Sequence, residues 1–93
     1  MYKITQGKGF QMTFANGWTV SVQWGAGNYC PNYNARPSEW TPSAYEALQR
    51  KLGAEGSPVA EAGWWKGSGD MEVSGNMSPD EVLALMVELA ARK

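Results

Sequence analysis

Apolar and polar residues alternate along two stretches near the start of the chain. Apolar side chains occupy every second position of residues 10–14 and again of residues 18–24. A period of two places these side chains on one face of a strand, and it is typical of half-buried antiparallel strands. The pattern predicts a hairpin whose core face carries Phe10, Met12, Phe14, Trp18, Val20, Val22 and Trp24.

The three residues between these strands, Ala15-Asn16-Gly17, allow two different turns. A two-residue Asn-Gly turn is typical of a tight hairpin. It would, however, pair Phe14 with Thr19 and set the apolar row of one strand against the polar row of the other. A three-residue loop pairs Phe14 with Trp18 and aligns both apolar rows. We therefore predict the longer loop, with Gly17 in the left-handed conformation of a bulge.

A helical period begins near residue 41. The cap is either Thr41, followed by proline at the first helical position, or Ser43, with a glutamate three residues later. Gly53 is typical of a helix end. Because apolar residues recur at spacings of three and four, the helix has one apolar stripe, made of Tyr45, Leu48 and Leu52.

Residues 59–66 and 71–74 predict a second hairpin, with its turn at Gly67-Ser68-Gly69. Their pattern leaves open whether Trp64 or Trp65 faces the core. Gly63 indicates either a bulge or a close backbone approach.

A second helix opens at Ser78-Pro79-Asp80-Glu81, which combines a capping serine, a proline at the first helical position and the glutamate of a capping box. Arg92 and Lys93 have the charge that favours a helix carboxyl end. The predicted stripe of this helix consists of Val82, Leu83, Met86, Leu89 and Ala90.

Together these elements predict one α+β domain spanning residues 1–93, in the order ββαββα. We expect a four-stranded, mainly antiparallel sheet with both helices packed on one face. A chain of 93 residues has too few side chains for a second core. Since one sheet face or edge would stay uncovered, we also expect a homodimer.

Composition and charge exclude several classes of function. Eight basic residues against nine acidic ones leave no basic surface of the kind that binds nucleic acid or anionic membranes. No apolar stretch is long enough to span a membrane. Histidine is absent, which removes Ser–His and Cys–His nucleophiles and His-ligated metals. The single cysteine, Cys30, fits a reducing compartment. We expect no cofactor, no metal site and no enzymatic activity.

Two motifs are similar to cofactor-binding or catalytic sequences, but each has a simpler explanation. Gly25-Ala26-Gly27 follows a strand, as in a dinucleotide-binding loop, but the third glycine is missing and no helix opens there. Asp70 and Glu72 share a strand face and could pair as acid and base, although a solvated hairpin surface explains them as well.

The long segment from Gly25 to Trp40 is the predicted binding region. A strand-to-helix connection needs about 2–6 residues, and longer loops are often functional. Aromatic, arginine and asparagine side chains are typical of contact surfaces, and the chain holds five tryptophans and four tyrosines. In the alternative interpretation, the loop folds back as a structural plug. The predicted binding residues are Asn28, Tyr29, Asn32, Tyr33, Asn34, Arg36, Trp40, Trp64 and Trp65.

The segments Lys8–Gly25 and Gly27–Cys30 resemble the opening of a group of small bacteriophage and prophage proteins, with the pattern GFxMTFxNGxTVSVQWGxGNYC. Ala60-Glu61-Ala62 and Ser78–Val82 are similar again, whereas Pro31–Ser57 holds more helix than the group would suggest. The resemblance implies a phage accessory protein that acts in the host bacterial cytoplasm. By class it implies an inhibitor of host defence, such as an anti-CRISPR-like protein.

Two functions of different classes follow. The first is stoichiometric binding to a host bacterial protein, either an immune component or a takeover target. The second is an oligomeric sponge that encloses a nucleotide-like signal, using Tyr29 and Tyr33 for stacking and Arg36 for a phosphate contact.

Overall fold

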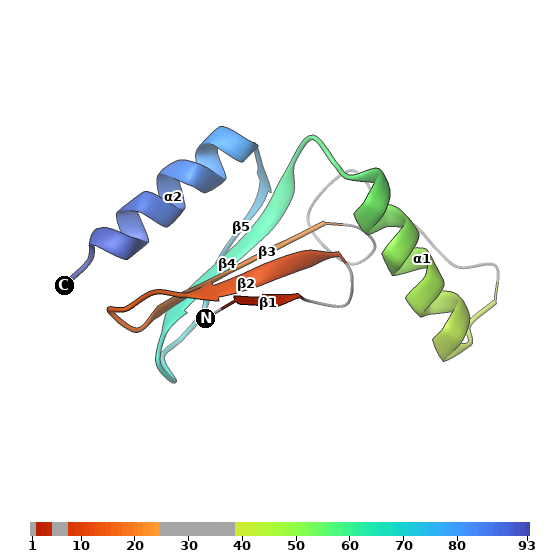
Figure 1. Cartoon of the computed structure of the whole chain (residues 1–93), viewed down its shortest axis with the longest axis horizontal. Helices are drawn as coiled ribbons and strands as arrows, with labels where there is room; N and C mark the ends of the chain where they lie inside the picture. The colour runs from red at the N-terminus through yellow and green to blue at the C-terminus, as the bar shows by residue number, and fades with distance from the viewer. Residues whose placement is uncertain (1, 5–7, 25–38) are drawn as a thin grey trace.

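A computed structural model describes residues 2–4, 8–24 and 39–93 and shows one antiparallel sheet with two helices (Figure 1). The elements are β1 (Tyr2–Ile4), β2 (Gly9–Thr13), β3 (Trp18–Gln23), α1 (Pro42–Glu55), β4 (Ala60–Lys66), β5 (Glu72–Met77) and α2 (Pro79–Ala91). The strands follow chain order across the sheet. The α+β class and the predicted ββαββα order are confirmed by β2 through α2, and β1 adds an edge strand beside β2 that the pattern did not predict.

The first hairpin has the predicted three-residue loop. Phe10 pairs with Val22 and Met12 pairs with Val20, so the apolar rows of β2 and β3 coincide. The amide of Phe14 donates to the carbonyl of Trp18 at 2.8 Å. Gly17 has a φ of 89°, the left-handed conformation that glycine adopts without steric cost.

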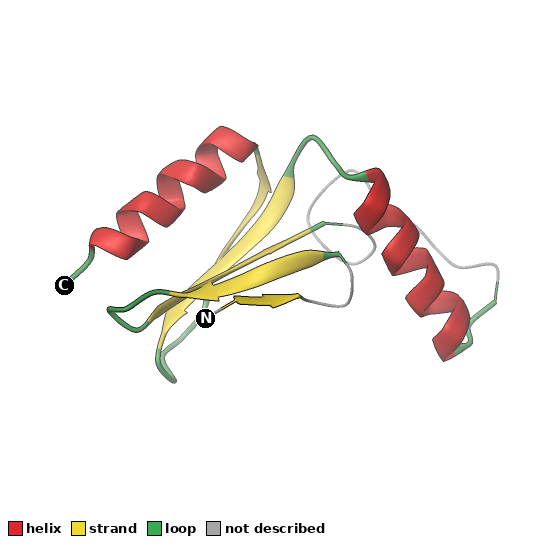
Figure 2. Cartoon of the chain, viewed as in Figure 1, coloured by secondary structure: helices red, strands yellow, loops and turns green. Residues whose placement is uncertain are grey.

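The core lies between this sheet and α2, which covers one face (Figure 2). Because side chains alternate across a strand, the even-numbered residues of β3 and β4 point toward α2. The buried members of the core are Val20, Val22, Ala60, Val82 and Leu89. Met86 packs against this group as predicted, but Leu83 and Ala90 do not, because they lie on the exposed side of α2.

Asn16, at the tip of the first hairpin, joins the turn to the carboxyl end of α2. Its amide nitrogen donates to the carbonyls of Leu89 and Arg92, each at 2.8 Å, and to that of Ala90 at 3.3 Å. Its side-chain oxygen accepts the amide of Trp18 at 3.1 Å. Carbonyls in the last turn of a helix lack the amide donor four residues later that the helix interior provides, so this side chain supplies a donor from a distant segment.

The expected packing of both helices on one face is wrong for α1. Figure 1 shows α1 extending away from the end of the sheet. The reason lies in the topology: β3 and β4 are antiparallel neighbours, and Gln23 pairs with Glu61, so the chain leaves and re-enters the sheet at the same end. The connecting helix therefore has no need to cross the face. Its contact with the sheet includes the indole of Trp24, which donates to the carbonyl of Gly53 at 3.2 Å.

α2 begins at the predicted residue, and α1 begins at one of the two residues that its sequence allowed. The predicted end of α1 at Gly53 is wrong, because the helix continues to Glu55 and Gly56 caps it. The hydroxyl of Thr41 accepts the amide of Ala44 at 3.2 Å, which selects Thr41 over Ser43 as the cap of α1. Ser78 and Glu81 form the complete capping box of α2. The hydrogen bonds from Ser78 hold the pKa of the Glu81 carboxyl below its usual value, because they favour the ionised form. Neither described helix is long and apolar enough to cross a membrane.

Candidate functional site

The predicted binding residues fall into two groups. Six of them lie outside the described residues: Asn28, Tyr29, Asn32, Tyr33, Asn34 and Arg36. Of the remaining three, Trp40 precedes α1, is 71% exposed and stacks on Tyr45, with the ring centroids 6.3 Å apart.

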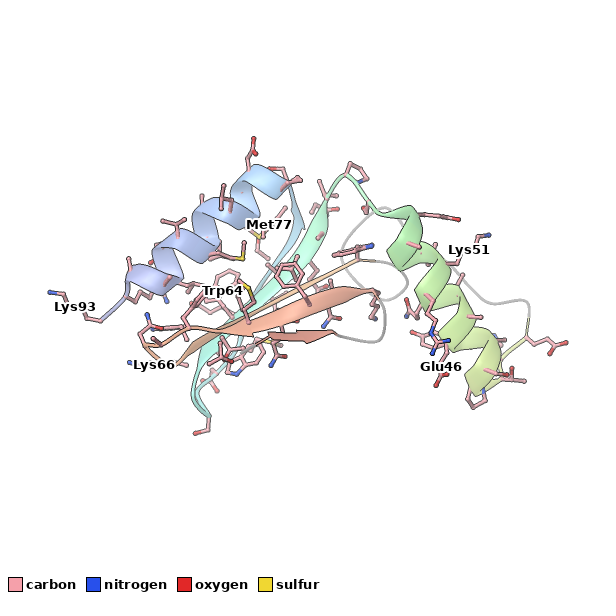
Figure 3. The ribbon with its side chains drawn as sticks, viewed as in Figure 1. Glu46, Lys51, Trp64, Lys66, Met77 and Lys93 are labelled. Carbon is pink, nitrogen blue, oxygen red and sulfur yellow. The ribbon has the colours of Figure 1, made fainter. Side chains whose placement is uncertain are left out.

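The two adjacent tryptophans of β4 point to opposite faces of the sheet. Trp64 pairs with Val20 and packs against the core on the side that α2 covers (Figure 3). Its indole donates to the carboxylate of Glu72 at 2.5 Å. Trp65 pairs with Thr19 and lies on the opposite face. The inward tryptophan is therefore Trp64, and the two side chains do not form one binding surface.

We call the sheet face opposite α2 the open face, because no described helix covers it (Figure 2). Its central part is polar. The hydroxyls of Thr13 and Thr19 lie 2.9 Å apart, and the side-chain amide of Gln23 donates to the hydroxyl of Ser21 at 2.9 Å. Thr19 and Ser21 are buried, so these bonds satisfy hydroxyl groups that have little access to water.

At the β4–β5 side the open face becomes apolar. Gly63 pairs with Val73, and continuing this register places Met71 beside Trp65. Met71 is 59% exposed, Val73 is 44% exposed and Trp65 is half-buried. We call these three residues the β4–β5 patch. Patches of exposed apolar side chains with polar residues around them are typical of protein interaction sites.

Gly63 shapes this patch. A Cβ atom at residue 63 would lie 3.0 Å from the sulfur of Met71, so the methionine side chain lies over the bare glycine backbone. Of the two sequence interpretations, close approach is therefore correct at Gly63, and the irregular register falls between Ala60 and Ala62 instead. Met71 and Val73 are not among the binding residues predicted from the sequence, although their spacing of two around Glu72 could have indicated one shared face.

A separate apolar cavity of about 270 Å³ lies where the core ends near the first turn of α2. Its wall includes Phe10, Val22, Trp24, Pro58, Met77 and Val82. The described residues of this wall include no charged side chain, so the cavity suits a small apolar group and offers no anchor for a phosphate.

The described residues contain no group of three cysteine, aspartate or glutamate side chains placed to hold a metal ion. Comparison with protein-family models, curated proteins and solved structures returned no match. Function is therefore inferred from the surfaces of the described residues and from the sequence resemblance.

Proposed function

We propose that this chain is a non-catalytic phage accessory protein that inhibits a host bacterial protein by stoichiometric binding through the β4–β5 patch. The observation that carries the proposal is the exposure of Met71 and Val73 beside Trp65, on a sheet face that no described helix covers. The phage context and the counter-defence role come from the sequence resemblance.

The energetics of the patch support a protein partner. Burying an apolar side chain of this size contributes about 1.5–3 kcal/mol, and this chain leaves two such side chains in water at the edge of the sheet. Tryptophan is among the residues most enriched at binding hot spots. Gln11, Thr13 and Gln23, half-buried on the same face, supply the polar surroundings that interfaces need outside their apolar centre.

The absence of histidine from the whole chain supports the non-catalytic part of the proposal. An acyl- or phosphoryl-transfer site would need another base and, in most cases, a metal. Binding alone requires only a complementary surface.

The test compares substitutions on two sides of the molecule. Met71→Glu and Val73→Lys place a charge in the patch, while Leu83→Glu places one at a position of nearly equal exposure on α2, 58% against 59% for Met71. Purified chains are tested by co-purification and titration against components of individual host defence systems, and the same variants are tested for protection of phage plating.

Both patch variants should weaken the 1:1 complex at least ~30-fold, which corresponds to the ~2 kcal/mol of a hot spot, and should abolish protection. Leu83→Glu should retain the affinity of the unsubstituted chain. Thermal melts of all variants separate loss of binding from loss of folding. Full binding by both folded patch variants, or silence of the unsubstituted chain across the panel, would refute the proposal. Loss of binding in Trp40→Ala alone would instead place the site at the Gly25–Trp40 segment.

The cavity favours a second candidate function, the binding of a small ligand. A nucleotide-like signal, as first expected, would have to use residues of the 25–38 segment for its phosphate, since the described cavity wall is apolar. Thermal shift with cyclic nucleotides, ADP-ribose derivatives and small aromatic hydrocarbons separates the two chemistries. A ligand at 100 times its dissociation constant should add ~2.7 kcal/mol of stability.

A further inference from the structure

Beyond its first turn, the outward side of α2 is largely apolar, which is unusual for a helix at the surface of a domain. Leu83 is 58% exposed and Val87 is 62% exposed, one helical turn apart. The exposed alanines Ala84, Ala90 and Ala91 lie on the same side. A surface helix of a soluble domain normally has charged or polar residues there. We call these five residues the α2 seam.

The charges of α2 are separated toward its two ends. Asp80 and Glu81 lie in the first turn, and Arg92 and Lys93 follow the last helical residue. Between residues 81 and 92, Glu88 is the one charged residue, and it lies beside the seam. Its carboxylate oxygen lies 2.8 Å from Nε of Arg92. Arg92 also lies over the ring of Trp18, 4.4 Å from its centre, which holds its charge at the carboxyl end of α2.

We propose that the α2 seam is the contact surface for a second copy of this chain, with the two α2 helices antiparallel around a two-fold axis at Val87. In this arrangement Val87 meets its own copy, Leu83 meets Ala91 of the second copy, and Ala84 meets Ala90. Leu83, the large side chain away from the two-fold axis, then faces a small alanine. The two helices can therefore approach to the ~8–10 Å separation of close helix packing. The surface is self-complementary, as a two-fold contact requires.

Charge selects the antiparallel direction. The acidic first turn of one helix comes beside Arg92 and Lys93 of the second copy, and the reverse contact repeats across the axis. The two helix dipoles also oppose each other favourably. A parallel pair would instead bring the acidic turns together and the basic ends together. The α2 seam lies on the side of the helix away from Val82 and Leu89, so pairing leaves the core intact.

This inference does not depend on the proposed function, because the α2 seam and the β4–β5 patch lie on different elements. The competing contact for a dimer is β5, an edge strand of the described sheet, where two sheets would join through backbone hydrogen bonds.

Sedimentation velocity over a range from micromolar to several hundred micromolar tests the inference. The unsubstituted chain, 10.2 kDa as a monomer, should move to twice this mass as concentration rises. Leu83→Glu should weaken this association at least ~10-fold, and Met71→Glu, at equal exposure, should leave it unchanged. Raising the salt concentration should weaken the association of the unsubstituted chain, because Asp80, Glu81 and Lys93 are exposed and Arg92 is only half-buried.

A cross-linking experiment locates the axis. Val87→Cys and Met71→Cys are each made in a Cys30→Ala background and treated with a short bis-maleimide. The cysteine at position 87 should form a covalent dimer in high yield, and the cysteine at position 71 should not. A chain that stays monomeric at every concentration overturns the inference. So does a dimer that persists in folded Leu83→Glu, which would instead support the β5 edge.

Discussion

The two helices of this protein are nearly equal in length and begin in the same way, yet they occupy very different positions. α1 has 14 residues and α2 has 13, and each starts with a proline after a capping hydroxyl residue. α2 lies along the sheet and contributes Val82 and Leu89 to the core. α1 extends from the end of the sheet (Figure 1), and its buried residues are Gln49 and Leu52.

This difference shows that capping and helix propensity can form a helix but do not decide where it packs. α2 follows β5 after a single residue, so the chain folds back over the sheet. The apolar side of α2 packs against Val20 and Val22. α1 leaves and re-enters the sheet at one end, and its shorter stripe of Tyr45, Leu48 and Leu52 meets no such row. Among the described residues, the helix side chains that pack into the apolar core cluster therefore come from α2.

Truncating one leucine in each helix should give the largest difference in the free energy of unfolding. Leu89 is fully buried, so Leu89→Ala should lower the free energy of unfolding by about 2–5 kcal/mol through lost burial and a new cavity. Leu48 is half-buried outside the described core, and Leu48→Ala should cost less than about 1 kcal/mol. Urea titration followed by circular dichroism measures both losses. Equal losses would mean that α1 contributes to the core as much as α2 does.

A smaller effect is expected at Asn16, which ties α2 to the first hairpin. Asn16→Ala should cost about 1–2 kcal/mol, because it removes the donor to three helix carbonyls. Asn16→Asp is the informative companion, since it keeps the acceptor for Trp18 but places a carboxylate at the negative end of the helix. It should be at least as destabilising as alanine in the same urea titration. If Asn16→Asp leaves the free energy of unfolding unchanged, the side chain of Asn16 stabilises only the hairpin turn and not the end of α2.

The smallest expected effect separates the two caps. Ser78→Ala should lower the free energy of unfolding by about 1 kcal/mol, because α2 packs on the core and the substitution removes the hydroxyl of the capping box. Thr41→Ala removes the equivalent bond from α1 but should change global stability by less than about 0.5 kcal/mol, reducing helix content instead. Thermal melts read the first quantity and the circular dichroism signal in the folded baseline reads the second. A Thr41→Ala variant that melts as early as Ser78→Ala would contradict the assignment of α1 to the periphery.

Local features of the fold could be predicted because the interactions behind them span only a few residues. Matching the apolar rows of residues 10–14 and 18–24 decided the loop at Gly17, and the capping box at Ser78 depends on a residue three positions away. β1 was missed because Tyr2-Lys3-Ile4 is too short to show a period, and it exists as a strand through pairing with β2.

The local sequence pattern of this protein therefore determines the order of β2 to α2, the register of the first hairpin and the start of α2, and it narrows the start of α1 to Thr41 or Ser43. Long-range packing places α1 at the end of the sheet, turns Trp64 inward and Trp65 outward, and brings Met71 and Val73 beside Trp65 on one surface. The physical reason is that strand pairing and helix docking depend on residues far apart in the chain. A local pattern states which side chains share a face, but long-range packing decides which face is buried.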